Sequence, residues 1–325
     1  MANDQSGTLA VRIAKRREEA ADIISFELAA TDGGLLPAFS AGSHIDVRLG
    51  EGMVRQYSLC NAPTERHRYL IAVLKEANGR GGSKAMHERL RIGDVLEISA
   101  PRNHFPLAHA GERSLLLAGG IGVTPILCMA ERLSAVGVDF EMHYCTRNRD
   151  RTAFTSYIAN SGFASRVHFH FDDGADLQRL DIPALLNTRG CCDTHIYVCG
   201  PKGFMDMVLA EARRQGWPEA RLHYEFFSAE PVQRDSDKSF EVQLASSGKV
   251  FIVPPDQSAS QVLAEAGIEI PTSCEQGVCG TCVTRVLEGA PDHRDLYFTP
   301  EEQAANDQFT PCCSRALSSR LVLDL

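Results

Sequence analysis

The sequence predicts a multidomain protein with three folds in series: an antiparallel β-barrel, an α/β domain with a doubly wound parallel sheet, and a small α+β domain. Three observations support this prediction. Short alternating strands broken by glycines fill the first hundred residues, buried apolar strands alternate with helices in the middle, and closely spaced cysteines stand near the end. We expect domains at 1–108, 109–228 and 240–325, with a polar linker at 229–239.

The composition is that of an ordinary soluble globular protein, and the expected location is the cytoplasm. Apolar residues make up 44% and charged residues 23% of the 325 residues. No run reaches the roughly 18 apolar residues of a membrane span, and the first residues, MANDQSG, carry no export signal. In a reducing cytoplasm the 11 cysteines would be thiols or metal ligands, because disulfides are rare there.

The negative charge is concentrated near the C-terminus. The net charge is −9, and the part from Asp237 onward holds 13 acidic and 6 basic residues. This balance makes nucleic acid an improbable partner. It is consistent with a solvated acidic surface, or with a docking face for a basic partner protein.

The barrel is predicted from strands at 25–28, 44–49, 54–59, 69–74 and 95–100, with one helix at 83–90. Its residues suggest a phosphate site. Arg55 of the strand 54–59 can meet a phosphate, and Tyr57 can cover a flat ring. The stretch GRGGS, 79–83, offers backbone N–H groups and the Ser83 hydroxyl. The alternatives are an edge-strand arginine and an ordinary glycine turn.

The α/β domain is predicted from strands at 114–120, 140–146, 167–171 and 195–200, with helices at 124–137 and 203–216. Glycines follow two of these strands, in LLLAGGIGVTPI and in YVCGP. Glycine turns at the carboxyl ends of parallel strands are where a dinucleotide pyrophosphate binds. Tight turns without a ligand are the alternative. Arg147, Arg149 and Arg151 are either solvated or able to meet a 2′-phosphate.

The last domain is predicted from a hairpin at 240–253, a helix that begins near Ser258 or Ser260, and a strand at 321–325. Between them, Cys274, Cys279 and Cys282 have the C-x4-C-x2-C spacing of a plant-type [2Fe–2S] site. The fourth ligand is Cys312 or Cys313. Gly277 and Gly280 allow the chain to approach a cluster closely. A zinc site is less favoured, because zinc motifs use paired cysteines; unligated thiols are a second alternative.

A flavin is expected between the two sites. Nicotinamide delivers two electrons as a hydride, whereas an iron–sulfur cluster accepts one at a time, so a converter is required. The remaining cysteines are expected to be ordinary thiols: Cys60, Cys128, Cys145, Cys191 and Cys192.

The motifs R-x-Y-S, G-R-G-G-S, A-G-G-I-G-V-T-P, C-G-P and C-x4-C-x2-C…C follow one another in a single order. In this order the chain resembles the family of phthalate dioxygenase reductase and vanillate O-demethylase reductase. The resemblance implies a barrel that binds FMN, a domain that binds NADH, and a β-grasp ferredoxin domain. It also selects Cys312 as the fourth cluster ligand and places Cys313 at an apolar position.

The resemblance further implies which residues contact the cofactors. Ser58 would hydrogen-bond the flavin, and Cys199 would lie against the nicotinamide. The FMN contacts would be Arg55, Gln56, Tyr57, Ser58, Ala72, Val73, Leu74, Arg80, Gly81, Gly82, Ser83, Thr124 and Phe227. The NADH contacts would be Gly120, Thr124, Cys199, Gly200 and Pro201, with Asp172 at a ribose. Two positions differ from the close relative: Gln56 stands where the relative has a smaller hydroxyl residue, and Leu74 stands where it has a lysine.

The function that the resemblance implies is electron transfer from NADH through FMN and [2Fe–2S] to a Rieske-type terminal oxygenase, by a monomer. Plant-type clusters lie near about −400 mV and Rieske centres between about −150 and +300 mV, so this direction is downhill. The alternatives are a reductase that uses NADPH or serves another oxygenase class, and a redox sensor without rapid turnover.

Overall fold

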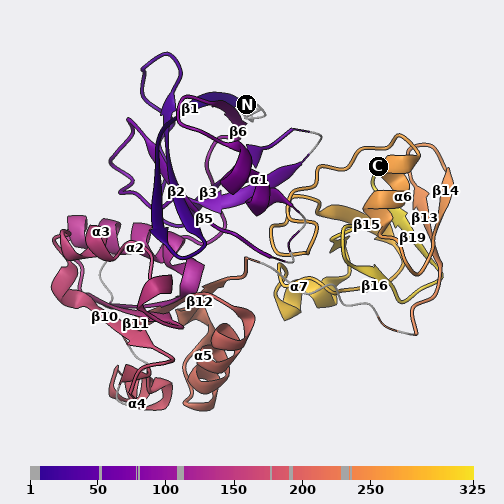
Figure 1. Cartoon of the computed structure of the whole chain (residues 1–325). Coiled ribbons are helices and arrows are strands. Elements are labelled where there is room, and N and C mark those ends of the chain that lie inside the picture. Colours follow the sequence, from indigo (N-terminus) through magenta and orange to yellow (C-terminus); the bar gives the residue numbers. More distant parts are fainter. Residues whose placement is uncertain are drawn as a thin grey trace. The chain divides into compact units, whose positions relative to one another are not determined.

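The computed structural model describes residues 8–50, 53–77, 79, 81–107, 113–175, 178–189, 193–227, 234 and 236–325, with only the backbone at Thr188 and Arg189. The chain forms two compact units, Met1–Phe227 and Ser228–Leu325, which Figure 1 colours along the sequence. The predicted boundaries near 108 and 228 lie outside the described residues. Among the described helices, none has the length and apolar character needed to cross a bilayer.

The first unit begins with an antiparallel barrel (Figure 1). The strand order is β4-β3-β6-β1-β2-β5, with β7 paired to β3, and β4 and β5 lie close together and close the barrel. The elements are β1 (Leu9–Ala20), β2 (Ile23–Ala30), β3 (Ser43–Arg48), β4 (Val54–Ser58), β5 (Tyr69–Leu74), α1 (Gly82–Arg89), β6 (Val95–Ile98) and β7 (Arg102–Asn103).

Strand β1 was not predicted from the sequence. Its buried side chains, Val11 and Ile13, occupy only its first half, and charged residues fill positions 15–19. The alternation that identifies a half-buried strand therefore ends after a few residues. The strand forms because both of its edges are paired, to β2 and to β6.

A five-stranded parallel sheet completes the first unit, in the order β10-β9-β8-β11-β12. Helix α2 packs on one face, and α4 and α5 pack on the other. The elements are β8 (Arg113–Gly119), η1 (Gly120–Gly122), α2 (Val123–Val136), β9 (Phe140–Thr146), η2 (Arg149–Arg151), α3 (Thr155–Ala159), η3 (Ala164–Arg166), β10 (Val167–Phe171), α4 (Ile182–Arg189), β11 (Thr194–Cys199), α5 (Lys202–Arg214), η5 (Glu219–Arg221) and β12 (Leu222–Glu225).

The barrel and the sheet share one apolar core. Ile23, Cys60, Ala72 and Phe105 of the barrel part pack in the same cluster as the buried face of α2. This continuous burial is why the two folds form a single unit, and it holds the barrel next to the carboxyl ends of the parallel strands.

The second unit is a mixed sheet in the order β14-β13-β19-β15-β17, on which α6 packs. Strands β13 and β19 are parallel, whereas β14 and β15 run antiparallel to their neighbours. The elements are β13 (Phe240–Leu244), β14 (Val250–Val253), α6 (Ala259–Glu265), β15 (Thr284–Glu288), β16 (Pro291–Asp292), α7 (Pro300–Ala305), β17 (Gln308–Phe309), β18 (Arg315–Ala316) and β19 (Arg320–Leu323). The predicted fold class, a barrel, a doubly wound parallel sheet and a small α+β unit with a helix packed on a mixed sheet, is confirmed.

Candidate functional site

The predicted phosphate site lies where β4 meets the start of α1. Gly81 precedes the helix with a φ of 85°, a conformation that glycine adopts without strain. A Cβ at Gly82 would stand 2.6 Å from the Arg55 side chain, so the guanidinium arm lies directly on the helix start. The Ser83 hydroxyl oxygen accepts the backbone N–H of Glu76 at 3.0 Å. Arg80 lies outside the described residues.

The residues predicted to line the flavin ring come from the adjacent strands β4 and β5. Tyr57 is half-buried and packs against the barrel core, and Ser58 is buried. Gln56 has a buried side-chain nitrogen, Nε2, that meets no hydrogen-bond partner among the described residues. Strand β5 contributes a buried wall, which consists of Ala72, Val73 and the half-buried Leu74.

Glu225 is a residue of this region that the sequence analysis missed. It ends β12 and pairs with Cys199 of β11, and its carboxylate is hydrogen-bonded to Ser58 across the boundary with the barrel. Its Oε2 is buried and has no partner in the described part of the chain. Burial raises the pKa of Glu225 to about 8, although the bond to Ser58 acts in the opposite direction. In the sequence, Glu225 could have been recognised only as a single acidic residue at the end of a strand. It was missed because strand β12 (Leu222–Glu225) was not predicted.

The two predicted nucleotide turns lie against each other. A Cβ at Gly122 would stand 2.3 Å from the Cys199 carbonyl oxygen, and one at Gly200 would stand 2.9 Å from the Gly119 Cα. Any larger side chain would force these turns apart. Gly120, with a φ of 53°, follows β8 directly. The arrangement leaves backbone N–H groups at the start of α2 near both turns, which suits a pyrophosphate.

Other predicted contacts lie around these turns. Thr124 is buried at the start of α2, and its hydroxyl donates to the Ile121 carbonyl at 3.1 Å. Cys199 is fully buried, and this burial raises the pKa of its thiol, so the thiolate is disfavoured. Pro201 follows at the start of α5. Phe227, two residues after Glu225, is half-buried against the shared core.

Asp172 lies farther away in the sheet. It directly follows the edge strand β10, two strands from β8, and its side chain is exposed. The nearby arginines have partners: Arg149 lies over the Phe171 ring at 5.4 Å, and Arg151 pairs with Asp22 at 3.4 Å. The exposed Arg147 bonds Asp173 through its backbone carbonyl.

The cysteine loop lies between α6 and β15. Gly277 and Gly280 have φ values of 72° and 67°, so both turns need the glycine conformation. Cys279, Cys282 and Cys312 are buried, and Cys274 is half-buried. The thiols are hydrogen-bonded in pairs, Cys274 with Cys279 and Cys312 with Cys282. The bond from Cys274 lowers the pKa of Cys279.

The donor set fits an iron–sulfur cluster. Four thiols that the sequence separates by up to 38 positions come from one loop and from the segment before β18, and the two glycines allow close backbone approach. In the described part of the chain no three ligating side chains close tightly around one point. Cys313 is also near: its thiol contacts Cys312 and lies 3.2 Å from the Thr310 hydroxyl.

The flavin side also fits its predicted group. Buried polar atoms in a folded protein usually have hydrogen-bond partners. Gln56 Nε2 and Glu225 Oε2 have none among the described residues, and both belong to the region where the flavin ring is predicted, so the ring is a candidate partner for them. Together, a barrel with a phosphate cradle, a parallel sheet with paired glycine turns, and a β-grasp unit with four cysteines define a flavin and pyridine-nucleotide reductase that carries its own ferredoxin domain.

Comparisons with known proteins agree with this class. Residues 242–317 match the model of a 2Fe-2S iron-sulfur cluster binding domain. Vanillate O-demethylase oxidoreductase of Pseudomonas putida is 58% identical over 96% of this chain and 98% of its own length. The solved structure of phthalate dioxygenase reductase, described as modular for electron transfer from pyridine nucleotides to [2Fe–2S], is 39% identical, covers 98% of both chains and has a TM-score of 0.76. An intact type IV self-sufficient cytochrome P450 monooxygenase is 38% identical, with a TM-score of 0.85 over 98% of this chain and 41% of that one.

The chain belongs to the family of oxygenase reductases that includes vanillate O-demethylase oxidoreductase and phthalate dioxygenase reductase. The predicted family and the predicted oxidoreductase function are thereby confirmed. The individual site residues stay predictions.

Proposed function

We propose that this chain takes electrons from NADH and passes them, through FMN and a [2Fe–2S] cluster, to the terminal oxygenase of an aromatic-ring system of the vanillate O-demethylase or phthalate dioxygenase type. The observation that carries the proposal is the identity of 58% to a vanillate O-demethylase oxidoreductase along nearly the whole chain. The order of the three sites along one chain supports it.

The barrel residues would hold and orient FMN. Arg55 and the N–H groups at the start of α1 would bind the phosphate, Tyr57 and the β5 wall would cover the ring, and Ser58 would be a hydrogen-bond partner of the ring. When bound, FMN accepts the two electrons of a hydride and releases them one at a time. Glu225, next to Ser58, would keep that hydroxyl oriented.

The sheet residues would bring the nucleotide to the ring. The paired turns at Gly119–Gly122 and Cys199–Pro201 would receive the pyrophosphate and the nicotinamide, with the Cys199 thiol as a buried surface and not as a nucleophile. Phe227, half-buried against the shared core, would contact the flavin. Asp172 would meet a ribose from the sheet edge.

The cluster would be held by Cys274, Cys279, Cys282 and Cys312, and it would carry one electron at a time. We propose a Rieske-type oxygenase as the acceptor, because transfer from a plant-type cluster near about −400 mV to a Rieske centre is downhill. The predicted monomer and the cytoplasmic location belong to the same proposal. The cytoplasmic location agrees with the nine free cysteines among the described residues.

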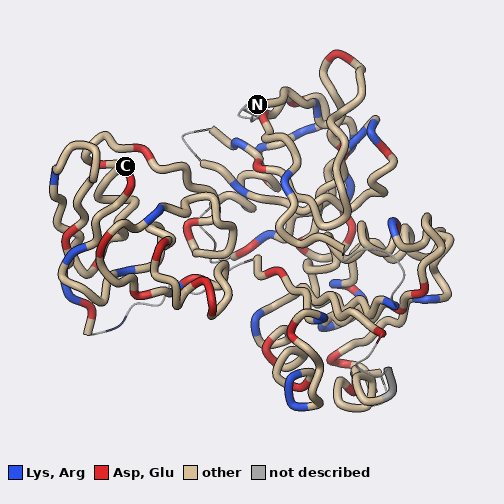
Figure 2. Tube along the Cα trace, turned by 180° about the vertical axis from the view of Figure 1, so that it is seen from behind, with Lys and Arg blue, Asp and Glu red and all other residues tan. Residues whose placement is uncertain are grey.

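The second unit has more acidic than basic positions along its chain (Figure 2), which suits a basic acceptor. From Asp237 onward there are 13 acidic and 6 basic residues, and most of these cations are already engaged. Arg285, Arg294 and Arg320 are in ion pairs within the unit, and the buried Arg315 donates to backbone carbonyls. The surplus negative charge therefore remains available to a basic partner surface.

The proposal is tested by adding the purified chain, loaded with FMN and cluster, to purified vanillate O-demethylase and phthalate dioxygenase oxygenase components. We expect NADH consumption coupled to oxidation of the aromatic substrate with at least one of them, and faster turnover with NADH than with NADPH. Slow, uncoupled NADH oxidation with every oxygenase, together with slow reduction of artificial acceptors, would favour a redox sensor instead.

A second acceptor class is favoured by one observation. The same three-part module occurs within a self-sufficient cytochrome P450 monooxygenase, where it covers 41% of that chain. A haem oxygenase partner is therefore the competing proposal, and it is tested by replacing the aromatic-ring oxygenase with a purified P450 in the same coupled assay.

A further inference from the structure

A buried carboxylate lies directly against the cysteine loop and takes no part in the proposed route of electrons. The side chain of Asp295 is 0% exposed. Its Oδ2 accepts the backbone N–H groups of Tyr297 and Phe298 at 3.2 and 2.9 Å. Its Oδ1 lies 3.3 Å from both the Ser314 hydroxyl and the His293 ring nitrogen Nδ1. Both oxygens thus accept hydrogen bonds, as an ionised carboxylate does.

Asp295 contacts the loop that carries three of the cysteines. A Cβ at Gly277 would stand 2.9 Å from both Cα and Cβ of Asp295, and the next backbone N–H, that of Leu296, donates to the Gly277 carbonyl at 3.0 Å. Two residues on, the Tyr297 ring lies where a Cβ of Gly280 would be. The segment 293–298 therefore forms one wall of the cysteine loop, and this contact explains why both loop positions are glycine.

The same carboxylate reaches the segment that carries the fourth cysteine. Ser314, two residues after Cys312, donates its hydroxyl to Asp295 and accepts the backbone N–H of Arg294 at 3.1 Å. Thr310 lies 2.9 Å from the Ser314 hydroxyl. Asp295 therefore connects the loop 274–282 to the segment 310–314, the two parts of the chain that supply the cluster thiols.

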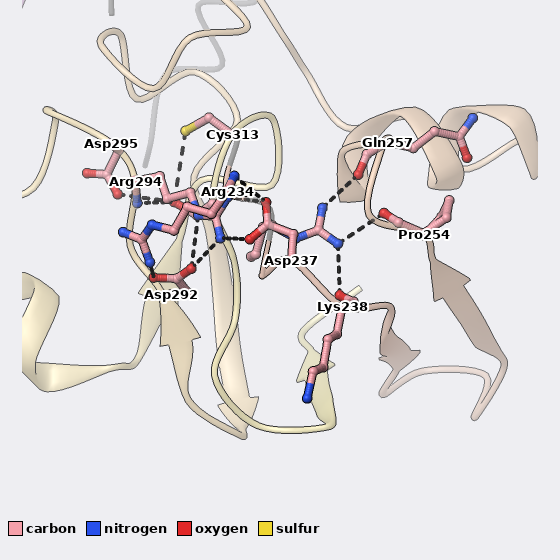
Figure 3. Close-up of polar contacts among 11 residues, drawn as sticks. Arg234, Asp237, Lys238, Pro254, Gln257, Asp292, Arg294, Asp295 and Cys313 are labelled. Atoms are coloured by element: carbon pink, nitrogen blue, oxygen red, sulfur yellow. Dashed lines mark hydrogen bonds and ion pairs between the residues drawn. The ribbon is translucent and has the colours of Figure 1, made fainter. Parts of the chain in front are cut away.

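The positive charge of the neighbouring Arg294 is directed to carboxylates other than Asp295. The Arg294 guanidinium, 4% exposed, turns to two other carboxylates (Figure 3), donating to Asp237 at 2.6 and 2.7 Å and to Asp292 at 2.6 and 2.9 Å. The groups that contact the carboxylate of Asp295 are two backbone amides, a hydroxyl and the His293 ring. Its negative charge consequently acts on its surroundings inside a buried site, where screening is weak.

We propose that Asp295 is a positioning residue of the cluster-binding unit, which passes electrons to the acceptor. It holds the two cysteine-bearing segments, 274–282 and 310–314, together. Through its buried charge it also keeps the reduction potential of the cluster low. The inference rests on the cluster in the proposed function. Net charge and hydrogen bonding around a cluster are among the determinants of its potential. A negative charge beside the cluster opposes the arrival of an electron, and a low potential favours the onward step to the acceptor.

The test uses the full-length protein with its FMN and cluster, and measures the midpoint potential by redox titration followed by EPR. Asp295→Asn and Asp295→Ser remove the charge, Asp295→Glu keeps it, and Asp324→Asn is a matched charge loss at an exposed position of the same unit. We expect the neutral variants to favour the reduced cluster about tenfold more than the original does, an upward shift of about 59 mV. The Glu and Asp324→Asn variants should stay close to the original value.

A second measurement follows loss of the visible cluster absorption in the presence of a chelator, which should be several-fold faster in the neutral variants. An unchanged potential in any neutral variant that keeps its cluster would overturn the electrostatic role, and unchanged cluster retention would overturn the positioning role. Loss of the cluster in both neutral variants but not in Asp295→Glu would support a requirement for the charge. Loss in Asp295→Glu as well would show that shape, not charge, is what the position requires. Reduction of ferricyanide by NADH, which reports the proposed flavin route, should persist in every variant.

Discussion

At the scale of single residues, Glu225 carries the clearest consequence of burial. It connects the parallel sheet to the barrel through Ser58, and its other oxygen is buried with no described partner. An acid in that position costs free energy when it ionises. Functional sites commonly retain such groups in spite of the cost, and this one adjoins both the predicted flavin and the predicted nicotinamide.

Glu225→Gln should stabilise the flavin-free protein at neutral pH. The folded-state pKa of about 8 exceeds the ordinary value of 4.5, so between these values the folded state holds a proton that the unfolded state releases. Stability therefore falls as pH rises through that window. The variant should lose this dependence and gain on the order of 2 kcal/mol at pH 7. Thermal unfolding at pH 5 and pH 7.5 measures it, with the exposed Glu97→Gln as control; equal pH slopes in all three proteins would contradict the expectation.

The fourth cluster ligand gives a second prediction at this scale. Cys312 is buried and hydrogen-bonded to Cys282, whereas the Cys313 thiol lies 3.2 Å from the Thr310 hydroxyl. Cys312→Ala should lose the visible absorption and EPR signal of the cluster and the oxygenase-coupled activity, while flavin reduction by NADH survives. Cys313→Val should keep the cluster with at most a modest change in stability. The opposite pattern would make Cys313 the ligand.

Sequence spacing alone could not choose between these neighbours. C-x4-C-x2-C identifies three ligands because all three lie in one short loop, but the fourth comes from a distant segment where two thiols are adjacent. The same limit applies to Glu225 and Asp295. Their importance arises from burial against segments more than 15 residues away in the sequence, which no local pattern reports.

At the scale of elements, local signals predicted most boundaries well. Helix α2 ends at Gly137 with a φ of 72°, and the 240–253 hairpin forms as expected. The elements that were missed have short or polar sequences with weak periodicity; they are β1, β7, α3, α4, β12, β15, β16, α7, β17 and β18. They form because neighbouring strands and cores supply the partners.

The start of α6 gives a prediction for an element. The sequence left Ser258 and Ser260 as alternatives, and Ser258 is the N-cap: its hydroxyl accepts the Gln261 backbone N–H at 3.3 Å, and the Gln261 side chain accepts the Ser258 N–H at 2.9 Å. Ser258→Ala should therefore lower the stability of the second unit by about 1 kcal/mol. Ser258→Asp, which keeps an acceptor, is the matched control. Chemical denaturation followed by cluster absorption measures the difference, and equal midpoints for the two variants would count against the capping role.

At the scale of the whole molecule, the division at Phe227 and Ser228 suggests a separable outlet. A chain truncated after Ala229 should bind FMN and reduce ferricyanide with NADH, because the barrel and the sheet share one core. It should fail to reduce cytochrome c efficiently or to drive an oxygenase, since the four predicted ligand cysteines are gone. Oxygenase turnover at the full-length rate would refute the three-part route.

The order of the three folds along the chain could be predicted from the sequence, because strand length, helix periodicity and cysteine spacing are all local sequence patterns. The position at which the linker ends could not be predicted from the sequence. Asp237 was assigned to the polar linker, yet its side chain is 6% exposed and bound to Arg294, and the Lys238 carbonyl accepts from Arg315 (Figure 3). A run of polar residues looks the same whether its charges are solvated or paired with distant ones.

The acidic surplus of the second unit leads to the last prediction. Helix α7, with the exposed Glu301 in its first turn, directly follows the segment 293–298 that lines the cysteine loop. If this side of the unit meets a basic oxygenase, Glu301→Lys should lower the coupled rate several-fold at low salt. Glu265→Lys, the same charge change at the exposed end of α6, should lower it less. Both effects should shrink as salt rises, because screening acts over roughly 10 Å at 0.1 M, while ferricyanide reduction stays nearly constant. A coupled rate that is independent of salt and equal in the two variants would make the acidic surface a matter of solubility.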